Sequence, residues 1–141
     1  MRHRVEVRFD VPREVAFDYL VDPGNRPAWQ SSLRAVDLID PEPLRVGSRW
    51  RDRTVVGAGP QMTLTALERP DLWAESGAWR GISANLSLSF ADDDEGRSLV
   101  TARMGFFGDG PWRLLAGLLS RVAPTAVQRD LERASRRLGK G

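Results

Sequence analysis

The chain has 141 residues, close to the usual length of one domain, and its 41% hydrophobic and 28% charged residues are typical of folded globular proteins rather than disordered or membrane-embedded ones. It has no cysteine and one histidine, which excludes disulfides and thiolate chemistry and argues against zinc or iron sites built from these residues. A net charge of +2 is too small to indicate a nucleic-acid-binding protein. We therefore expect one domain over residues 1–141, located in the cytoplasm, because we find no secretory signal and no apolar run long enough to span a bilayer.

The first predicted elements are a strand and a short helix. Residues 4–9 alternate between apolar and charged side chains, which is the pattern of a half-buried strand. A helix is predicted over residues 12–21, because Pro12 suits a first helical turn and Pro23 followed by glycine ends the run. The segment NRPAWQ is predicted to add a second, brief helical turn.

From about residue 33 the sequence predicts an antiparallel meander of short strands separated by turn residues. The segment DDDEG at 92–96 is interpreted as a hairpin turn, because it lacks the spacing of a calcium-binding EF-hand loop. The segment GAGP at 57–60 is also interpreted as a turn, since no lysine and no helix follow it. The predicted strands lie near residues 33–39, 49–56, 61–68, 72–79, 82–91 and 97–106.

The last predicted element is a long helix that begins near residue 111. Its apolar residues form two stripes that differ in phase across Pro124, so we expect a kink or a short break there, because proline removes a helical hydrogen bond. The stretch PWRLLAGLLSRVA is too short to span a membrane and contains two arginines, so burial in the core is expected for it rather than membrane contact.

The order of these elements resembles the START-like superfamily, also labelled SRPBCC or polyketide cyclase/dehydrase proteins. Four segments carry the resemblance: VPREVAFDYLVDP, NRPAW, VGSRW and GRSLVTARMGFFG. The resemblance implies an α+β helix-grip fold, in which a seven-stranded antiparallel sheet wraps around a long C-terminal helix and two short helices follow the first strand. It also implies a cavity between sheet and helix, which the family uses for hydrophobic ligands such as lipids, polyketides and hormones. We expect no cofactor.

If the apolar strand faces point inward, they line this implied cavity together with one stripe of the last helix. Each such residue could instead simply fill a core. Trp29 lies in a loop rich in proline and glycine, and is either an anchor between the small helices and the sheet or a lid over the cavity mouth. The expected ligand contacts are Trp29, Trp50, Thr54, Met62, Leu64, Leu86, Leu88, Met104, Phe106, Leu115, Leu119 and Val122.

Two residues are weak candidates for catalysis. Asp52 shares a strand face with Trp50 and Thr54, so it could move a proton or orient a ligand hydroxyl. Alternatively, the other face of that strand is the inward one, or Asp52 pairs with a neighbouring arginine. His3 is in phase with the apolar face of the first strand, but its place near the terminus also fits simple exposure. A catalytic triad is excluded, because there is no GxSxG motif and only one histidine.

Three functions stay open at this point. The preferred one is binding of a hydrophobic small molecule, and the second is a polyketide aromatase/cyclase or dehydratase that uses the same cavity. The third is an interaction module for a protein or ribonucleoprotein, acting through arginines in the third strand and the last helix, although a solvated face is the preferred interpretation of these charges. We expect no metal, no nucleic acid and no membrane span. The sequence does not indicate an oligomeric state.

Overall fold

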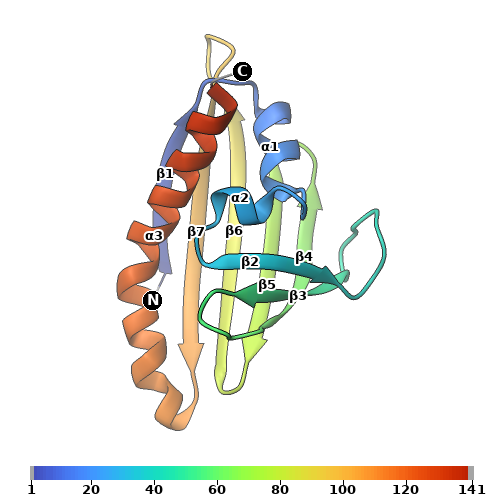
Figure 1. The fold of residues 1–141 in the computed structure, drawn as a ribbon. Coiled ribbons are helices and arrows are strands. Elements are labelled where there is room, and N and C mark those ends of the chain that lie inside the picture. Colours follow the sequence, from blue (N-terminus) through green and yellow to red (C-terminus); the bar gives the residue numbers. More distant parts are fainter. Residues whose placement is uncertain (1, 140–141) are drawn as a thin grey trace.

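The computed structural model describes residues 2–139 and consists of one curved sheet with helices on its concave side (Figure 1). All strand pairs are antiparallel, in the order β1-β7-β6-β5-β4-β3-β2. This is the helix-grip architecture that the resemblance implied. The elements are β1 (Arg2–Phe9), α1 (Arg13–Val21), α2 (Arg26–Trp29), β2 (Leu33–Leu38), β3 (Arg49–Thr54), β4 (Gln61–Glu68), β5 (Leu72–Trp79), β6 (Ile82–Asp92), β7 (Ser98–Gly108), the 3-10 turn η1 (Gly110–Trp112) and α3 (Arg113–Gly139).

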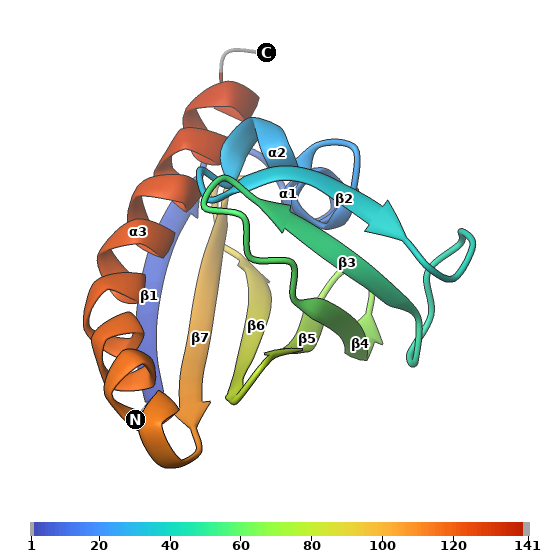
Figure 2. The ribbon, with the colours of Figure 1, turned by 60° about the horizontal axis from the view of Figure 1, so that its bottom comes forward.

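The strand order follows from the turns of the meander. Strands β2 to β7 pair with their neighbours in sequence, and β1 joins the far edge by pairing with β7. The turn at Arg80 is tight, and this residue adopts a positive φ of 56° between β5 and β6. The sheet is strongly curved, so that the edge formed by β2 and β3 turns toward α3 (Figure 2). The curvature creates the concave face on which the site is built.

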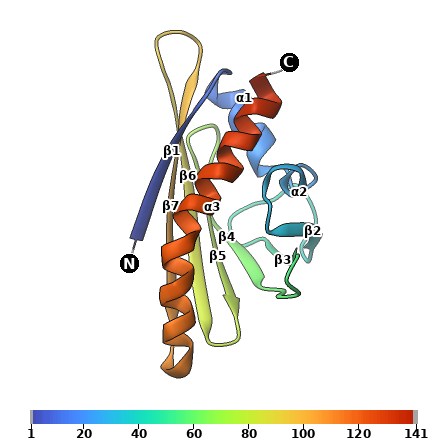
Figure 3. The ribbon, with the colours of Figure 1, turned by 60° about the vertical axis from the view of Figure 1, so that its left-hand side comes forward.

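The long helix α3 lies along β1 and β7 on this concave side, and α1 packs over β6 and β7 (Figure 3). The end of β7 meets α3 closely. A Cβ atom added at Gly108 would lie 2.4 Å from the backbone oxygen of Trp112. Only glycine fits this approach, and it fixes where the helix starts relative to the sheet.

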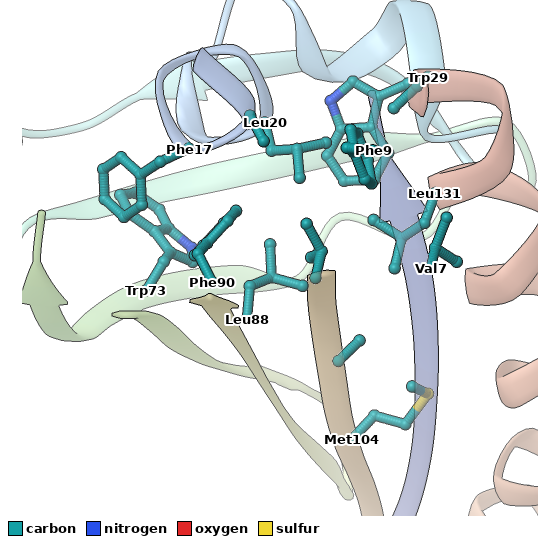
Figure 4. Close-up of a cluster of buried hydrophobic side chains, with 14 of the residues drawn as sticks. Val7, Phe9, Phe17, Leu20, Trp29, Trp73, Leu88, Phe90, Met104 and Leu131 are labelled. Atoms are coloured by element: carbon teal, nitrogen blue, oxygen red, sulfur yellow. The ribbon is translucent and has the colours of Figure 1, made fainter. Parts of the chain in front are cut away.

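The solid core lies where α1 and α2 cover the sheet (Figure 4). Phe17 of α1 meets Phe90 of β6 edge to face, with ring centroids 5.1 Å apart. Leu131 and Ala134 of α3 complete this core and have no exposed surface. Burial of such side chains removes apolar surface from water, which stabilises the fold by about 25 cal/mol for each Å² buried.

A kink or a short break was expected at Pro124, and the break is wrong, because α3 is continuous from Arg113 to Gly139. The helix is curved over the sheet (Figure 2). Pro124 is half-buried, and the helix continues through it although proline cannot donate a backbone hydrogen bond.

The first half of α3 also departs from the expected core packing. Leu114, Leu118 and Val122, which are four residues apart, are 86%, 56% and 52% exposed. The face toward the sheet is occupied by the small residues Ala116 and Ser120, which are buried. Small residues let the helix approach the sheet, and Leu114 and Leu118 point away from it. No helix in the described part of the chain is long and apolar enough to cross a membrane.

Candidate functional site

A cavity of ≈ 790 Å³ lies between the concave face of the sheet and α3. Its wall is made by α2, by strands β3 to β7 and by the middle of α3. Most of the lining side chains are apolar, and a few polar groups gather beside α2. A large cavity with this composition is typical of sites that bind small molecules.

Most of the residues predicted to contact a ligand line this cavity. They are Trp29, Thr54, Met62, Leu86, Leu88, Met104, Phe106, Leu115, Leu119 and Val122. Trp50 and Leu64 are not part of the lining, because they are 1% and 0% exposed and belong to the solid core. The Trp50 ring packs against the ring of Trp73, with centroids 6.0 Å apart.

Trp29 is the last residue of α2 and is 4% exposed. It belongs to the same buried cluster as Phe9 and Leu131, and it also contributes to the cavity wall (Figure 4). Its backbone oxygen accepts a hydrogen bond from Arg133 Nη1 at 3.0 Å, which ties α2 to α3. Its indole Nε1 is buried and has no hydrogen-bond partner within residues 2–139. This placement fits an anchor between α2 and the core better than a mobile lid.

The polar groups of the cavity centre on a buried ion pair. Arg26 of α2 and Glu75 of β5 face each other with 4% and 2% of their side chains exposed. Arg26 Nη1 donates to Glu75 Oε1 at 2.9 Å, and Nη2 donates to Oε2 at 3.3 Å. Gln30 Oε1 accepts from Arg26 Nε and Nη2 at 3.2 and 2.9 Å. The pair therefore connects the short helix to the middle of the sheet.

Asp52 of β3 lies beside this pair, is 6% exposed and lines the cavity. Its Oδ1 accepts a hydrogen bond from Trp50 Nε1 at 3.0 Å. On β5, Glu75 Oε1 accepts in the same way from Trp73 Nε1 at 2.8 Å. In both strands a tryptophan and an acid stand two residues apart, so the two side chains share one strand face.

Sequence reasoning missed Arg26 and Glu75 as site residues. The available signal was the repeated pattern of tryptophan, one residue, then an acid, in Trp50-Arg51-Asp52 and Trp73-Ala74-Glu75. An acid in phase with a buried tryptophan points into the protein, where it needs a partner. The inward direction of Asp52, which was one of two open alternatives, is the one that the structure adopts.

The charges in this group shift one another's protonation. Burial, helped by the charge of Glu75, raises the pKa of Asp52 to about 6, against the opposing effects of the Arg26 charge and the Trp50 hydrogen bond. Burial alone would lower the pKa of Arg26, but the charges of Glu75 and Asp52 outweigh it and raise the pKa above its usual value. Asp52 is therefore a carboxyl group that changes its charge near neutral pH.

His3 does not join this group. It lies on β1, opposite Met104 of β7, and it is absent from the cavity wall. Its Nε2 is buried without a hydrogen-bond partner within residues 2–139. The two candidates for catalysis are thus on different parts of the sheet, and only Asp52 reaches the cavity. In the described part of the chain, no three acidic or histidine side chains are grouped as metal ligands would be.

The β3–β4 loop and α3 both contribute exposed residues to the rim of the cavity. Val56 of the loop and Val122 of the helix both line the cavity, and they are 84% and 52% exposed. Arg26, Asp52 and Glu75 are buried, so they form the inner end of the same space. A ligand would thus pass an apolar rim before it reaches the charged group.

Residues 2–140 match the family model described as polyketide cyclase/dehydrase and lipid transport. No curated protein matches the chain.

Several solved structures are similar in fold. A START superfamily protein from Mycobacterium smegmatis superposes with a TM-score of 0.81 at 8% identity, covering 99% of this chain and 97% of that one. The protein XoxI from Bacillus cereus gives 0.77 at 10% identity, covering 97% and 94%. DR_A0006 from Deinococcus radiodurans gives 0.68 at 20% identity, covering 96% and 95%. At these identities the likeness shows the fold alone.

Proposed function

Because the chain belongs to the polyketide cyclase/dehydrase and lipid transport family, we propose that it binds a hydrophobic or aromatic small molecule, lipid-like or polyketide-like, in the cavity between the sheet and α3. The observation that carries this proposal is the ≈ 790 Å³ space with its mainly apolar wall. An apolar molecule gains about 0.8 kcal/mol for each methylene group removed from water, which is the driving force for occupying such a space.

The shape of the space also supports binding. A protein whose core were merely loosely packed would have small voids scattered among the side chains. Here one continuous cavity leads from the exposed rim at Val56 and Val122 to the buried group at Arg26. The interaction-module hypothesis assumes a filled core and receives less support from this arrangement. A cytoplasmic location stays a prediction.

The test fills the cavity from a strand position. Ala84 of β6 lines the cavity, whereas its exposed neighbour Ser83 points to the other face of the sheet. We expect Ala84→Phe to weaken binding of an uncharged lipophilic probe, such as dodecanol, at least tenfold. Ser83→Phe should leave the affinity within about twofold of the unchanged protein. Isothermal titration calorimetry measures both, with circular dichroism to check folding.

Equal affinities of the two variants would contradict the proposal, because the probe would then bind outside the cavity. Absence of binding to the unchanged protein, across alcohols and aromatic probes of several sizes, would contradict it as well.

A second candidate function is catalysis, as in a polyketide cyclase or dehydratase, and the observation that favours it is Asp52. General acid–base groups work best when their pKa lies near the operating pH, and the pKa of Asp52 is raised to about 6. In this case Asp52→Asn should abolish conversion of a poly-β-ketone chain into cyclised product even at chain concentrations that saturate the variant. Unchanged conversion by Asp52→Asn would exclude this role.

A further inference from the structure

One carboxylate oxygen of a cavity-lining aspartate has no donor within residues 2–139. Asp52 is 6% exposed and lines the cavity. Its Oδ1 accepts from Trp50 Nε1, whereas its Oδ2 accepts no hydrogen bond from any residue in the range 2–139. A buried carboxylate with a free oxygen is costly unless something donates to it.

The neighbouring cation is already engaged. The nitrogens of Arg26 donate to both oxygens of Glu75 and to Gln30 Oε1. The pair is held by a short helix on one side and by the sheet on the other, so its geometry is fixed by the fold. Four of the five N–H groups of Arg26 are thus used within the protein, and its charge is matched by Glu75, so it offers an acidic ligand no free two-pronged contact.

The balance of charge at this end is negative. Arg26 supplies one positive charge, and Glu75 and ionised Asp52 supply two negative ones. Asp130, the other buried acid of the cavity wall, accepts from Arg133 Nη1 at 3.2 Å and from the backbone nitrogen of Ser31 at 3.2 Å. A carboxylate brought to this end would meet like charge in a poorly hydrated space, whereas a hydroxyl or ammonium group would find an acceptor.

On the basis of the proposed function, we infer that the ligand presents a hydrogen-bond donor, a hydroxyl or an ammonium group, to Asp52 Oδ2, and that the cavity discriminates against molecules that end in a carboxylate. The apolar wall holds the body of the ligand, and Asp52 selects its inner end. Fatty acids are therefore poor ligands, although their chains would fit the wall.

The test compares three probes with the same apolar chain: dodecanol, dodecylamine and dodecanoate. They are titrated into the intact protein at about pH 7.5, where a carboxyl group whose pKa is about 6 is ionised, and below the concentrations at which they form micelles. We expect dodecanoate to bind at least tenfold more weakly than the tighter of the other two. Whichever of the alcohol and the amine is tighter identifies the donor.

Two variants locate the effect. Asp52→Asn keeps an oxygen that accepts from Trp50 but removes the charge, so dodecanoate should gain at least fivefold in affinity and dodecylamine should lose at least tenfold. Asp37→Asn removes an exposed carboxylate on β2 that pairs with Arg53, outside the cavity. This control should leave the affinity for each of the three probes within about twofold.

The inference is overturned if dodecanoate binds the unchanged protein as tightly as dodecanol and dodecylamine do. It is also overturned if Asp52→Asn shifts the three affinities no more than Asp37→Asn does. In both outcomes the probes still bind and the proposed function survives. If neither these probes nor an uncharged aromatic probe binds, the proposed function fails, and the inference fails with it.

Discussion

At the scale of single residues, the main feature is an ion pair that is almost completely removed from water. Arg26 and Glu75 lose their hydrogen bonds to water on folding. Paired hydrogen bonds between the two side chains replace them, with the closest contact at 2.9 Å. Such pairs add little net stability compared with apolar residues of the same size, but loss of one partner leaves a buried charge uncompensated.

We therefore predict that Arg26→Met lowers the free energy of unfolding by about 3–5 kcal/mol, because it leaves Glu75 charged and unpaired. The double variant Arg26→Met with Glu75→Gln should recover at least half of that loss, since no buried charge of the pair then remains. Urea denaturation of the unchanged protein, of Arg26→Met, of Glu75→Gln and of the double variant measures the four free energies of unfolding. If the double variant were as unstable as the sum of the two single variants, the side chains would not be coupled.

Asp52 gives a second prediction, which concerns pH. Its pKa rises from 3.8 to about 6 on folding, so the folded protein binds a proton more tightly than the unfolded chain does. Ionisation of Asp52 therefore lowers the free energy of unfolding progressively as the pH rises from 4 to 6. The effect is constant above that range, at about 3 kcal/mol.

Asp52→Asn lacks this titration. The free energy of unfolding of the variant, minus that of the unchanged protein, should rise by about 1–3 kcal/mol between pH 4 and pH 7. Denaturation curves at matched pH values give this difference, in which the titrations of the exposed acids cancel. A difference that does not change with pH would show that Asp52 keeps an ordinary pKa.

At the scale of the elements, the strands were the most predictable part. Alternation over residues 82–91 indicates a strand in any context, and β6 spans Ile82–Asp92. The packing of helix α3 was harder to predict. The periodicity of its leucines shows that they share a face, but it does not show what covers that face. Leu114 and Leu118 face solvent, and the cavity takes the neighbouring stripe with Leu115 and Leu119.

The two halves of α3 should therefore respond differently to the same substitution. Leu131→Ala is expected to cost about 2–5 kcal/mol of unfolding free energy, because the side chain is fully buried in the core. Leu118→Ala should change stability by no more than about 0.5 kcal/mol, because this leucine is 56% exposed. Thermal or urea unfolding separates the two, and a large loss for Leu118→Ala would mean that this face is covered.

At the scale of the whole molecule, there are two regions: a packed core beneath α1 and α2, and the cavity beneath the first half of α3. The sequence indicated the sheet, the terminal helix and most of the cavity wall, because strand phase places those side chains on one face. The ion pair could not be predicted in the same way, since Arg26 and Glu75 are 49 residues apart and meet only through the curvature of the sheet.

The most direct test of the central claim is native mass spectrometry of the intact protein, isolated without detergent from the cells that make it. If the cavity holds an apolar molecule, we predict a peak heavier than the 15.7 kDa chain. The added mass should disappear when the protein is denatured. The added mass should be present in Ser83→Phe and missing in Ala84→Phe. A bound molecule retained equally by Ala84→Phe, or the mass of the bare chain in every preparation, would contradict the claim.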